Sequence, residues 1–423
     1  MVEKKFPLTK EQLKEIVKKY PTPFNIYDER GIRQAARRML KAFSILPQFK
    51  EFYAVKALPN PYILEILKEE GLGTDCSSYP ELLLSKAVGI TGEDVMFSSN
   101  ETPDNEFLAA AKLGAVINFD DITHVDIAAN VLGGKLPDLI SFRYNPGPLK
   151  KGNVIIGKPE EAKYGLTREQ IFEGYKKASA LGAKRFGLHT MVASNELDSS
   201  YFVETAKILF ELVLEVYQKT GIRIEMVNIG GGMGIPYKPE ETPVDFDFVA
   251  RGVKELYDQI IEKNNLGPVK ICTECGRIIT GPYGYLVSTA IREKHTYRDY
   301  IGLDSSMADF MRPGVYGSWQ YMSVVGKEGK SPDMVYDVVG SLCENCDKFA
   351  VQRQLPKIDM GDFVVLHDTG AHGRAMGFNY NGKLRSGELL LKEDGSIVEI
   401  RRKETVSDYF STLDYPGLKD IEL

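Results

Sequence analysis

The sequence has 423 residues, of which 43% are hydrophobic and 26% are charged. This balance is that of a folded globular protein, and the length exceeds that of one ordinary domain. The 53 basic and 59 acidic residues give a formal net charge of −6, the wrong sign for a protein that binds nucleic acid non-specifically. We therefore expect two domains, or one large barrel with an addition, and a small-molecule partner.

The N-terminal segment and the cysteines bear on where the protein works. Met1–Lys19 is basic and has the spacing of an amphipathic helix, but no long apolar run follows it as in a secretory signal. The apolar stretch Phe107–Phe119 is interrupted by Lys112 and is too short to cross a bilayer. Five cysteines make no disulfide framework at this length. We expect a cytoplasmic protein with no membrane partner.

From residue 51 onward, short β-rich runs alternate with segments in which apolar residues have helical spacing. Eight such units over roughly 250 residues is the size at which a parallel sheet closes into a barrel. The pattern therefore predicts an α/β fold with a (β/α)8, TIM-like barrel over residues 35–282. The predicted strands are Glu51–Ala57, Gly73–Ser78, Asp94–Ser99, Ala115–Asp121, Leu139–Asn145, Arg185–Val192, Ile224–Gly231 and Lys270–Gly276, and helical candidates between them include Pro61–Glu70, Pro80–Val88, Asp104–Leu113, Tyr201–Thr220 and Asp245–Glu262.

Beyond Pro282 the pattern changes to strand-like runs with little helical periodicity between them. Residues 283–423 are therefore predicted to form a mostly antiparallel β domain. The early run Pro23–Asp28 precedes the barrel, so we assign residues 1–34 to the same β domain. The runs after Pro282 are Tyr285–Glu293, Trp319–Val325, Met334–Val339, Asp362–His367 and Glu388–Leu391.

Reactive groups of such barrels lie where the strands end, and the first strand ends at Lys56 between apolar neighbours. A lysine desolvated there has a lowered pKa and can form a Schiff base with a carbonyl. The alternative is a rim lysine whose stem lies along the surface and whose ammonium stays in water.

The seventh strand ends in Gly230, Gly231 and Gly232. Consecutive glycines followed by a helix let backbone N–H groups approach a phosphate, and barrels of this type often bind phosphate after strands seven and eight. The alternative is a flexible turn.

The eighth strand ends in Glu274, with Arg277 close behind it. By themselves the two predict a rim ion pair. Beside a lysine and a phosphate-binding glycine loop, Glu274 is suited to hold the protonated ring nitrogen of pyridoxal 5'-phosphate (PLP). Protonation of this nitrogen makes the cofactor an electron acceptor. His189 lies near the end of strand six. It could contact the cofactor, or it could equally be an internal, hydrogen-bonded histidine. The combination favours a PLP enzyme.

The cysteines offer a different interpretation. Cys272 with Cys275, and Cys343 with Cys346, form two C-x-x-C pairs, which could together hold zinc in a structural or interaction protein. The long separation of the pairs, and the location of the first pair in a barrel strand, argue against zinc and against a redox pair. We predict no metal.

Six short motifs extend over nearly the whole chain: Tyr53–Ala57, Asn228–Gly234, Glu274–Arg277, Met311–Tyr316, Cys343-Glu344 and Asn379–Asn381. Together they resemble those of diaminopimelate decarboxylases, PLP enzymes with an alanine-racemase-like barrel and a C-terminal β domain. The resemblance implies a carboxy-lyase that converts meso-diaminopimelate to L-lysine with release of CO2.

The resemblance also implies roles for individual residues. Lys56 would carry the cofactor covalently and Glu274 would pair with its ring nitrogen. Cys343, supplied by the second subunit of a homodimer, would protonate the carbanion carbon. The remaining cofactor-binding residues would be His189, Met191, Ser194, Gly230, Gly231, Gly232 and Tyr380, and the substrate-binding residues Arg277, Arg312, Tyr316, Glu344 and Tyr380.

Two arginines suit a substrate with a second carboxylate, because a planar guanidinium binds a carboxylate through two parallel hydrogen bonds. Lysine or ornithine would leave them unpaired, which is costly when they are buried. The chain departs from the family pattern at Met191, where a histidine usually stacks on the cofactor, and at Cys275 and His372. A decarboxylase of another diamino acid, of the lysine, ornithine or arginine type, therefore stays open.

Two further alternatives share the fold. A racemase would favour an arginine rather than Glu274 at the ring nitrogen. A non-catalytic PLP-binding homologue would be a barrel alone or would lack Lys56, and neither description fits the sequence.

Overall fold

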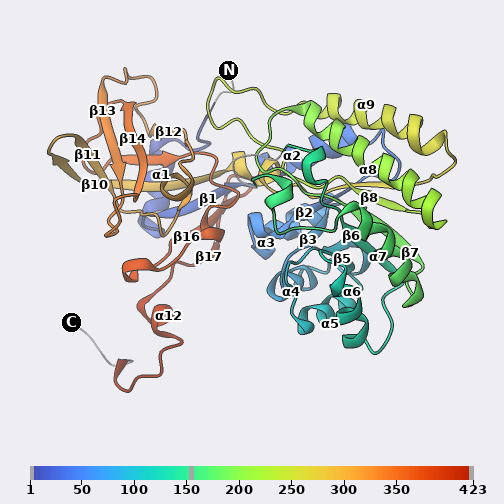
Figure 1. Ribbon diagram of the computed structural model, residues 1–423. Coiled ribbons are helices and arrows are strands. Elements are labelled where there is room, and N and C mark those ends of the chain that lie inside the picture. The colour runs from blue at the N-terminus through green and yellow to red at the C-terminus, as the bar shows by residue number, and fades with distance from the viewer. Residues whose placement is uncertain (1–3, 152–156, 419–423) are drawn as a thin grey trace. The chain divides into compact units, whose positions relative to one another are not determined.

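The computed structural model describes residues 4–151 and 157–418 (Figure 1). These form two compact units. One comprises Arg33–Ile235 and Thr242–Ile279, and the remaining described residues make up the other. The limits predicted for the barrel domain, residues 35–282, stay a prediction.

The larger unit is a closed barrel of eight parallel strands in sequential order, which confirms the predicted architecture. The barrel closes where Lys50 and Glu51 of the first strand pair with Cys272 and Thr273 of the last. Phe52, Met96 and other apolar side chains of the barrel strands pack together in one buried cluster. The strands are β2 Lys50–Ala54, β3 Gly73–Cys76, β4 Val95–Phe97, β5 Val116–Phe119, β6 Leu139–Arg143, β7 Arg185–His189, β8 Met226–Asn228 and β9 Lys270–Thr273.

Helices follow the barrel strands and surround them (Figure 1). Local sequence sets their ends: the Asn60 side chain accepts the Tyr62 N–H at the start of one helix, and Gly114, with φ 76°, ends another. The predicted helix Asp245–Glu262 is α-helical only to Leu256 and continues as a π-helix. The helices are α2 Glu29–Phe43, α3 Pro61–Glu69, α4 Tyr79–Ala87, α5 Asp104–Leu113, α6 Thr123–Val131, α7 Arg168–Ala180, α8 Ser199–Thr220, α9 Phe246–Leu256 and α10 Arg277–Thr280.

The second unit is built on a nine-stranded, mostly antiparallel sheet, which confirms the fold class. The N-terminal strand β1 lies between β10, with which it is antiparallel, and β16, with which it is parallel, so the arm joins the β domain as predicted. The strands are β1 Phe24–Asp28, β10 Gly284–His295, β11 Asp299–Leu303, β12 Met322–Val324, β13 Met334–Val339, β14 Lys348–Leu355, β15 Phe363–Leu366, β16 Gly387–Leu391 and β17 Ile397–Arg401.

Three short helices complete this unit: α1 Lys10–Lys19, α11 Arg312–Tyr316 and α12 Val406–Phe410. The first begins at a capping box formed by Thr9 and Gln12, later than the predicted Met1, and residues 1–3 lie outside the described part. Leu13 on its inner face packs with Phe24 and Ile26 of β1 in one apolar cluster.

Among the described residues, none of the helices has both the length and the apolar character needed to span a bilayer.

Candidate active site

Lys56 lies at the carboxyl end of the barrel, in a 3₁₀ turn, Val55–Ala57, directly after β2. Its neighbours are buried but Lys56 itself is exposed, so the structure matches the solvated rim lysine rather than a desolvated one. Burial raises the pKa values of Asp75 and Glu81, and the positive charge of Lys56 opposes this; the same charge contributes to the lowered pKa of Glu274. The amine therefore faces a cluster of carboxyl groups from β3, α4 and the end of β9.

Glu274, the first residue after β9, is the charged member of that cluster. Its side chain is 4% exposed, and the amide of Asn228 donates a hydrogen bond of 3.2 Å to its Oε2. The Nε2 atom of His189 lies 3.0 Å from the same oxygen. Burial would raise the pKa of Glu274, but His189, Lys56 and Arg143 outweigh it and lower that pKa. A buried carboxylate is thus kept ionised at the mouth of the barrel.

His189 is an internal, hydrogen-bonded histidine, and its role toward a cofactor stays a prediction. It is buried, and its Nδ1 lies 2.9 Å from the side-chain amide nitrogen of Asn118 on β5. Its other nitrogen faces Glu274. The guanidinium of Arg277 donates to the Ser194 hydroxyl at 3.4 Å. The predicted residues His189, Glu274, Ser194 and Arg277 therefore lie in two neighbouring groups of the same unit.

Asp75, on β3, is a buried carboxyl that the sequence analysis missed. Neither of its side-chain oxygens has a hydrogen bond of ordinary geometry among the described residues. Burial and the charge of Glu274 raise its pKa well above the usual value, and Lys56 opposes them. A buried polar group without a partner is costly, so this position is suited to a ligand or to the neutral acid.

The glycine loop after β8 has no room for side chains. A Cβ atom at Gly230, Gly231 or Gly232 would lie 2.2–2.3 Å from the carbonyl oxygens of Thr190, Glu274 and Ala193, respectively. The backbone therefore threads between the ends of β7 and β9. The helix expected directly after these glycines is absent there, since α9 starts only at Phe246. Any phosphate contact of this segment would therefore come from the backbone of the loop itself.

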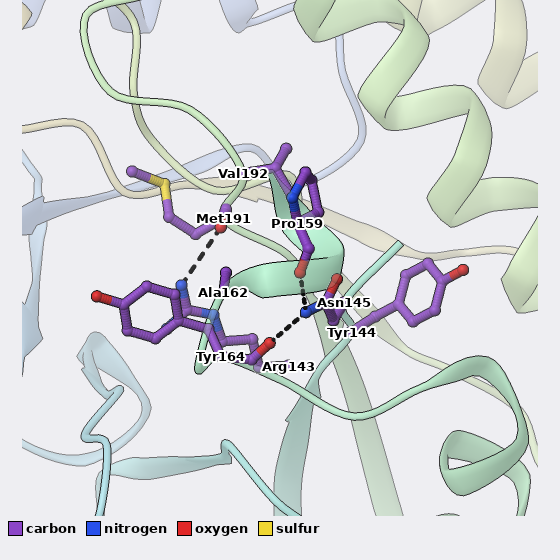
Figure 2. A pocket seen from close by; sticks show the side chains of 8 residues that line it. All are labelled: Arg143, Tyr144, Asn145, Pro159, Ala162, Tyr164, Met191 and Val192. Carbon is purple, nitrogen blue, oxygen red and sulfur yellow. Dashed lines mark hydrogen bonds between the residues drawn. The ribbon is translucent and has the colours of Figure 1, made fainter. Parts of the chain in front are cut away.

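Met191 connects the glycine loop to a narrow pocket that Arg143, Tyr144, Asn145, Pro159, Ala162, Tyr164 and Val192 also line (Figure 2). The Gly231 N–H points at the Met191 sulfur at 3.3 Å, and Arg143 donates to the Met191 carbonyl, also at 3.3 Å. The Arg143 guanidinium lies 4.4 Å from the centre of the Tyr164 ring. Figure 2 shows these side chains around one opening, with Asn145 bridging Pro159 and Tyr164 below it. The thioether is thus held beside the glycines.

The other predicted site residues belong to the second unit. Arg312 is buried at the start of α11, and its guanidinium lies 5.6 Å from the centre of the half-exposed Tyr316 ring. Cys343 and Glu344 are exposed, and the Cys343 N–H donates to the Asn381 side chain at 2.7 Å. Asn381 follows Tyr380, which is 48% exposed. The structure thus forms two local groups, one on α11 and one where the turns at Cys343 and Tyr380 meet.

All five cysteines have free thiols. Cys272 and Cys275 are buried, and burial raises the pKa of Cys272 to about 12, which keeps it an unreactive thiol. Within residues 4–151 and 157–418, no three His, Cys, Asp or Glu side chains come together in a way that could hold a metal ion.

The barrel residues fit a cofactor with an aldehyde, a ring nitrogen and a phosphate. Lys56 is an accessible amine, Glu274 a buried anion, and the glycine loop a stretch of backbone that side chains cannot cover. Asp75, whose two oxygens have no hydrogen bond of ordinary geometry within the described part of the chain, adds a place for a polar ligand. This combination defines a PLP-dependent barrel enzyme.

Comparison with known proteins gives the family. A family model described as "Pyridoxal-dependent decarboxylase, pyridoxal binding domain" matches residues 29–281. Protein TabA of Pseudomonas amygdali pv. tabaci is 42% identical over 410 residues, which cover 97% of this chain and 94% of TabA. The diaminopimelate decarboxylase of Methanothermobacter thermautotrophicus is 33% identical, covering 95% of this chain and 94% of the relative. The chain belongs to the pyridoxal-dependent decarboxylases.

A solved structure supports the same assignment. Diaminopimelate decarboxylase from M. jannaschii in complex with L-lysine superposes with a TM-score of 0.87 at 27% identity, covering 97% of this chain and 95% of that chain. The resemblance, the PLP cofactor and the carboxy-lyase class predicted from the sequence are thereby confirmed.

Four residues of the site escaped the sequence analysis: Asp75, Asn118, Arg143 and Asn228. All are polar side chains in the last three residues of a barrel strand. This position was a usable signal, because polar groups near the carboxyl end of a buried strand face the active site of such barrels.

Proposed function

We propose that this decarboxylase acts on meso-diaminopimelate and releases L-lysine and CO2. The observation that carries the PLP chemistry of this proposal is the Glu274–His189 pair beside the glycine loop, since an ionised, buried acid is what a protonated pyridine nitrogen requires. The names of the relatives at 33% identity and of the lysine complex support the substrate.

The residues of this chain divide the work in the proposed reaction. Lys56 holds the cofactor, Gly230–Gly232 and Tyr380 hold its phosphate, and Met191 packs on its ring through a thioether that makes no ionic contact. When bound, PLP accepts the electrons that the departing CO2 leaves behind.

The substrate contacts come from a second set of residues. Arg277, Arg312 and Tyr316 orient a carboxylate, and Glu344 receives the distal ammonium. Cys343 of the second subunit in a homodimer supplies a proton to the former α-carbon. The cytoplasmic location expected from the sequence belongs to the same proposal.

A second candidate is decarboxylation of a different diamino acid. It is favoured by Met191 in place of a stacking histidine and by the further departures at Cys275 and His372.

The test is CO2 release from meso-diaminopimelate, lysine, ornithine and arginine, each offered separately to the protein with PLP. We expect release from diaminopimelate by the wild type and none by Lys56→Ala. Release from lysine or ornithine alone would overturn the substrate assignment and leave the family assignment intact.

Mixing inactive Lys56→Ala and Cys343→Ala proteins tests whether the active site is shared between two subunits, because a mixed dimer regains one intact site.

A further inference from the structure

The barrel closes between the strand that leads to Lys56 and the strand that leads to Glu274, and few backbone contacts hold this seam. Two Cα pairs join β2 to β9, Lys50 with Cys272 and Glu51 with Thr273. Closer to the mouth, the Ala54 N–H meets the Cys275 carbonyl at 3.5 Å, a long hydrogen bond.

The side chain of Glu51 spans this weakly bonded stretch. It is almost fully buried, and its two oxygens accept from both residues that flank Glu274 in the chain. The Thr273 hydroxyl donates to Oε2, and the Cys275 N–H donates to Oε1 at 2.6 Å. A single carboxyl group from β2 therefore fixes the backbone on both sides of Glu274.

The segment held by Glu51 fits tightly against its other neighbours. A Cβ atom at Gly276 would lie 2.6 Å from the Cβ of Ala57, next to Lys56. A Cβ atom at Gly231 would lie 2.3 Å from the Glu274 carbonyl oxygen. Small displacements of this segment are therefore passed to the lysine turn and to the glycine loop.

The charge of Glu51 is consistent with a structural hold rather than a second anion. Burial raises its pKa well above the usual value, and the nearby Glu274 and Asp75 raise it further. A neutral Glu51 leaves the negative charge of the cluster on Glu274, where His189 and Arg143 stabilise it. An amide could fill the same place.

We propose that Glu51 is a positioning residue, which clamps Thr273 and Cys275 so that the Glu274 carboxylate is presented to the cofactor ring. This inference rests on the role proposed for Glu274.

The experiment compares PLP binding and spectra in the full-length protein. The Kd for PLP and the absorption band of the bound cofactor are measured for the wild type and for Glu51→Ala, Glu51→Gln and Glu274→Gln. Tyr175→Phe is the matched control, since it removes a different buried hydrogen bond of the barrel wall, 2.7 Å to the Gly187 carbonyl. Thermal unfolding of each protein reports the loss of stability separately.

We expect Glu51→Ala to weaken PLP binding about ten-fold, the scale of a lost buried hydrogen bond to a charged or closely held group. It should also shift the cofactor band in the direction seen in Glu274→Gln. Glu51→Gln should keep both properties near the wild type, and Tyr175→Phe should lower stability alone. If Glu51→Ala does not fold, Thr273→Val, which removes one of the two contacts, should give part of the same shift.

Two results would overturn the inference, and they are distinguishable. In the first, the cofactor band is shifted in Glu274→Gln, but both the band and the Kd for PLP are normal in Glu51→Ala or in Thr273→Val. This result removes the role of Glu51 alone. A normal band in Glu274→Gln removes the role of Glu274 and the positioning role with it.

Discussion

Replacing Gly231 by alanine tests how closely the glycine loop and the Glu274 segment are coupled. The φ angle of Gly231 is not in the left-handed region, so an added methyl group brings no backbone strain of its own. Its Cβ would, however, lie 2.3 Å from the Glu274 carbonyl oxygen, whereas ordinary contacts begin at 3.4 Å. Because the obstacle is backbone and not a movable side chain, one of the two loops must shift.

The required shift is about 1 Å, and a displacement of that size at a catalytic site costs on the order of 10²-fold in rate. Overpacking of this kind also lowers the free energy of unfolding by about 1–3 kcal/mol. We therefore expect Gly231→Ala to lose about two orders of magnitude in kcat for decarboxylation and to bind PLP more weakly. CO2 release under substrate saturation and a PLP titration measure the two effects.

Gly329→Ala is the matched control, because the added Cβ there meets nothing within 4 Å and the φ angle is not in the left-handed region. It should be indistinguishable from the wild type. A Gly231→Ala enzyme with wild-type kcat and PLP affinity would refute the close approach of the two loops.

Three other predictions concern charge and proton transfer. His189→Gln removes the imidazole that lowers the pKa of Glu274, so the acid limb of the pH profile of kcat/KM should move to higher pH; an unmoved limb would contradict this. Burial, with the Lys4 charge, lowers the pKa of His367 from 6.5 to about 3, so its contribution to stability is present above pH 6.5 and is lost as the pH falls toward 3. Denaturant titrations at pH 7 and pH 4 should therefore show a difference on the order of a few kcal/mol that His367→Gln reduces. Cys343→Ser should slow decarboxylation by about 10²–10⁴-fold, as loss of a general acid does, and leave the PLP Kd unchanged, whereas a wild-type rate would exclude Cys343 as the proton donor.

Much of the fold was predictable from local sequence, because each barrel strand is a short apolar run between turn residues and each helix carries its own periodic face. The exact ends of the strands were less predictable. Lys56 was expected within a strand but lies in a 3₁₀ turn, since Val55 and Ala57 extend the apolar pattern beyond the last pairing of β2. Glu274 was expected to end a strand and lies one residue beyond it.

The residues that escaped prediction depend on partners far away in the chain. Glu51 precedes the continuous apolar run Phe52–Val55, and nothing local predicts its burial, because a glutamate is rarely fully buried unless it is paired. Its burial depends on Thr273, 222 positions later, which only closure of the barrel brings into contact. Asp75 likewise meets the charges of Glu274 and Lys56, which lie just after other barrel strands, only once the barrel has formed.

The position of β1 has a consequence for synthesis of the protein on the ribosome. Its neighbours in the sheet, β10 and β16, begin at residues 284 and 387. At a translation rate of roughly 5–20 residues per second, tens of seconds pass between the synthesis of β1 and that of β16. During this time the apolar side chains of Phe24 and Ile26 lack their final packing partners. The nascent chain must keep this early strand away from other open sheet edges while the barrel sequence between them is translated, so overexpression without chaperone capacity should favour aggregates nucleated by the N-terminal arm.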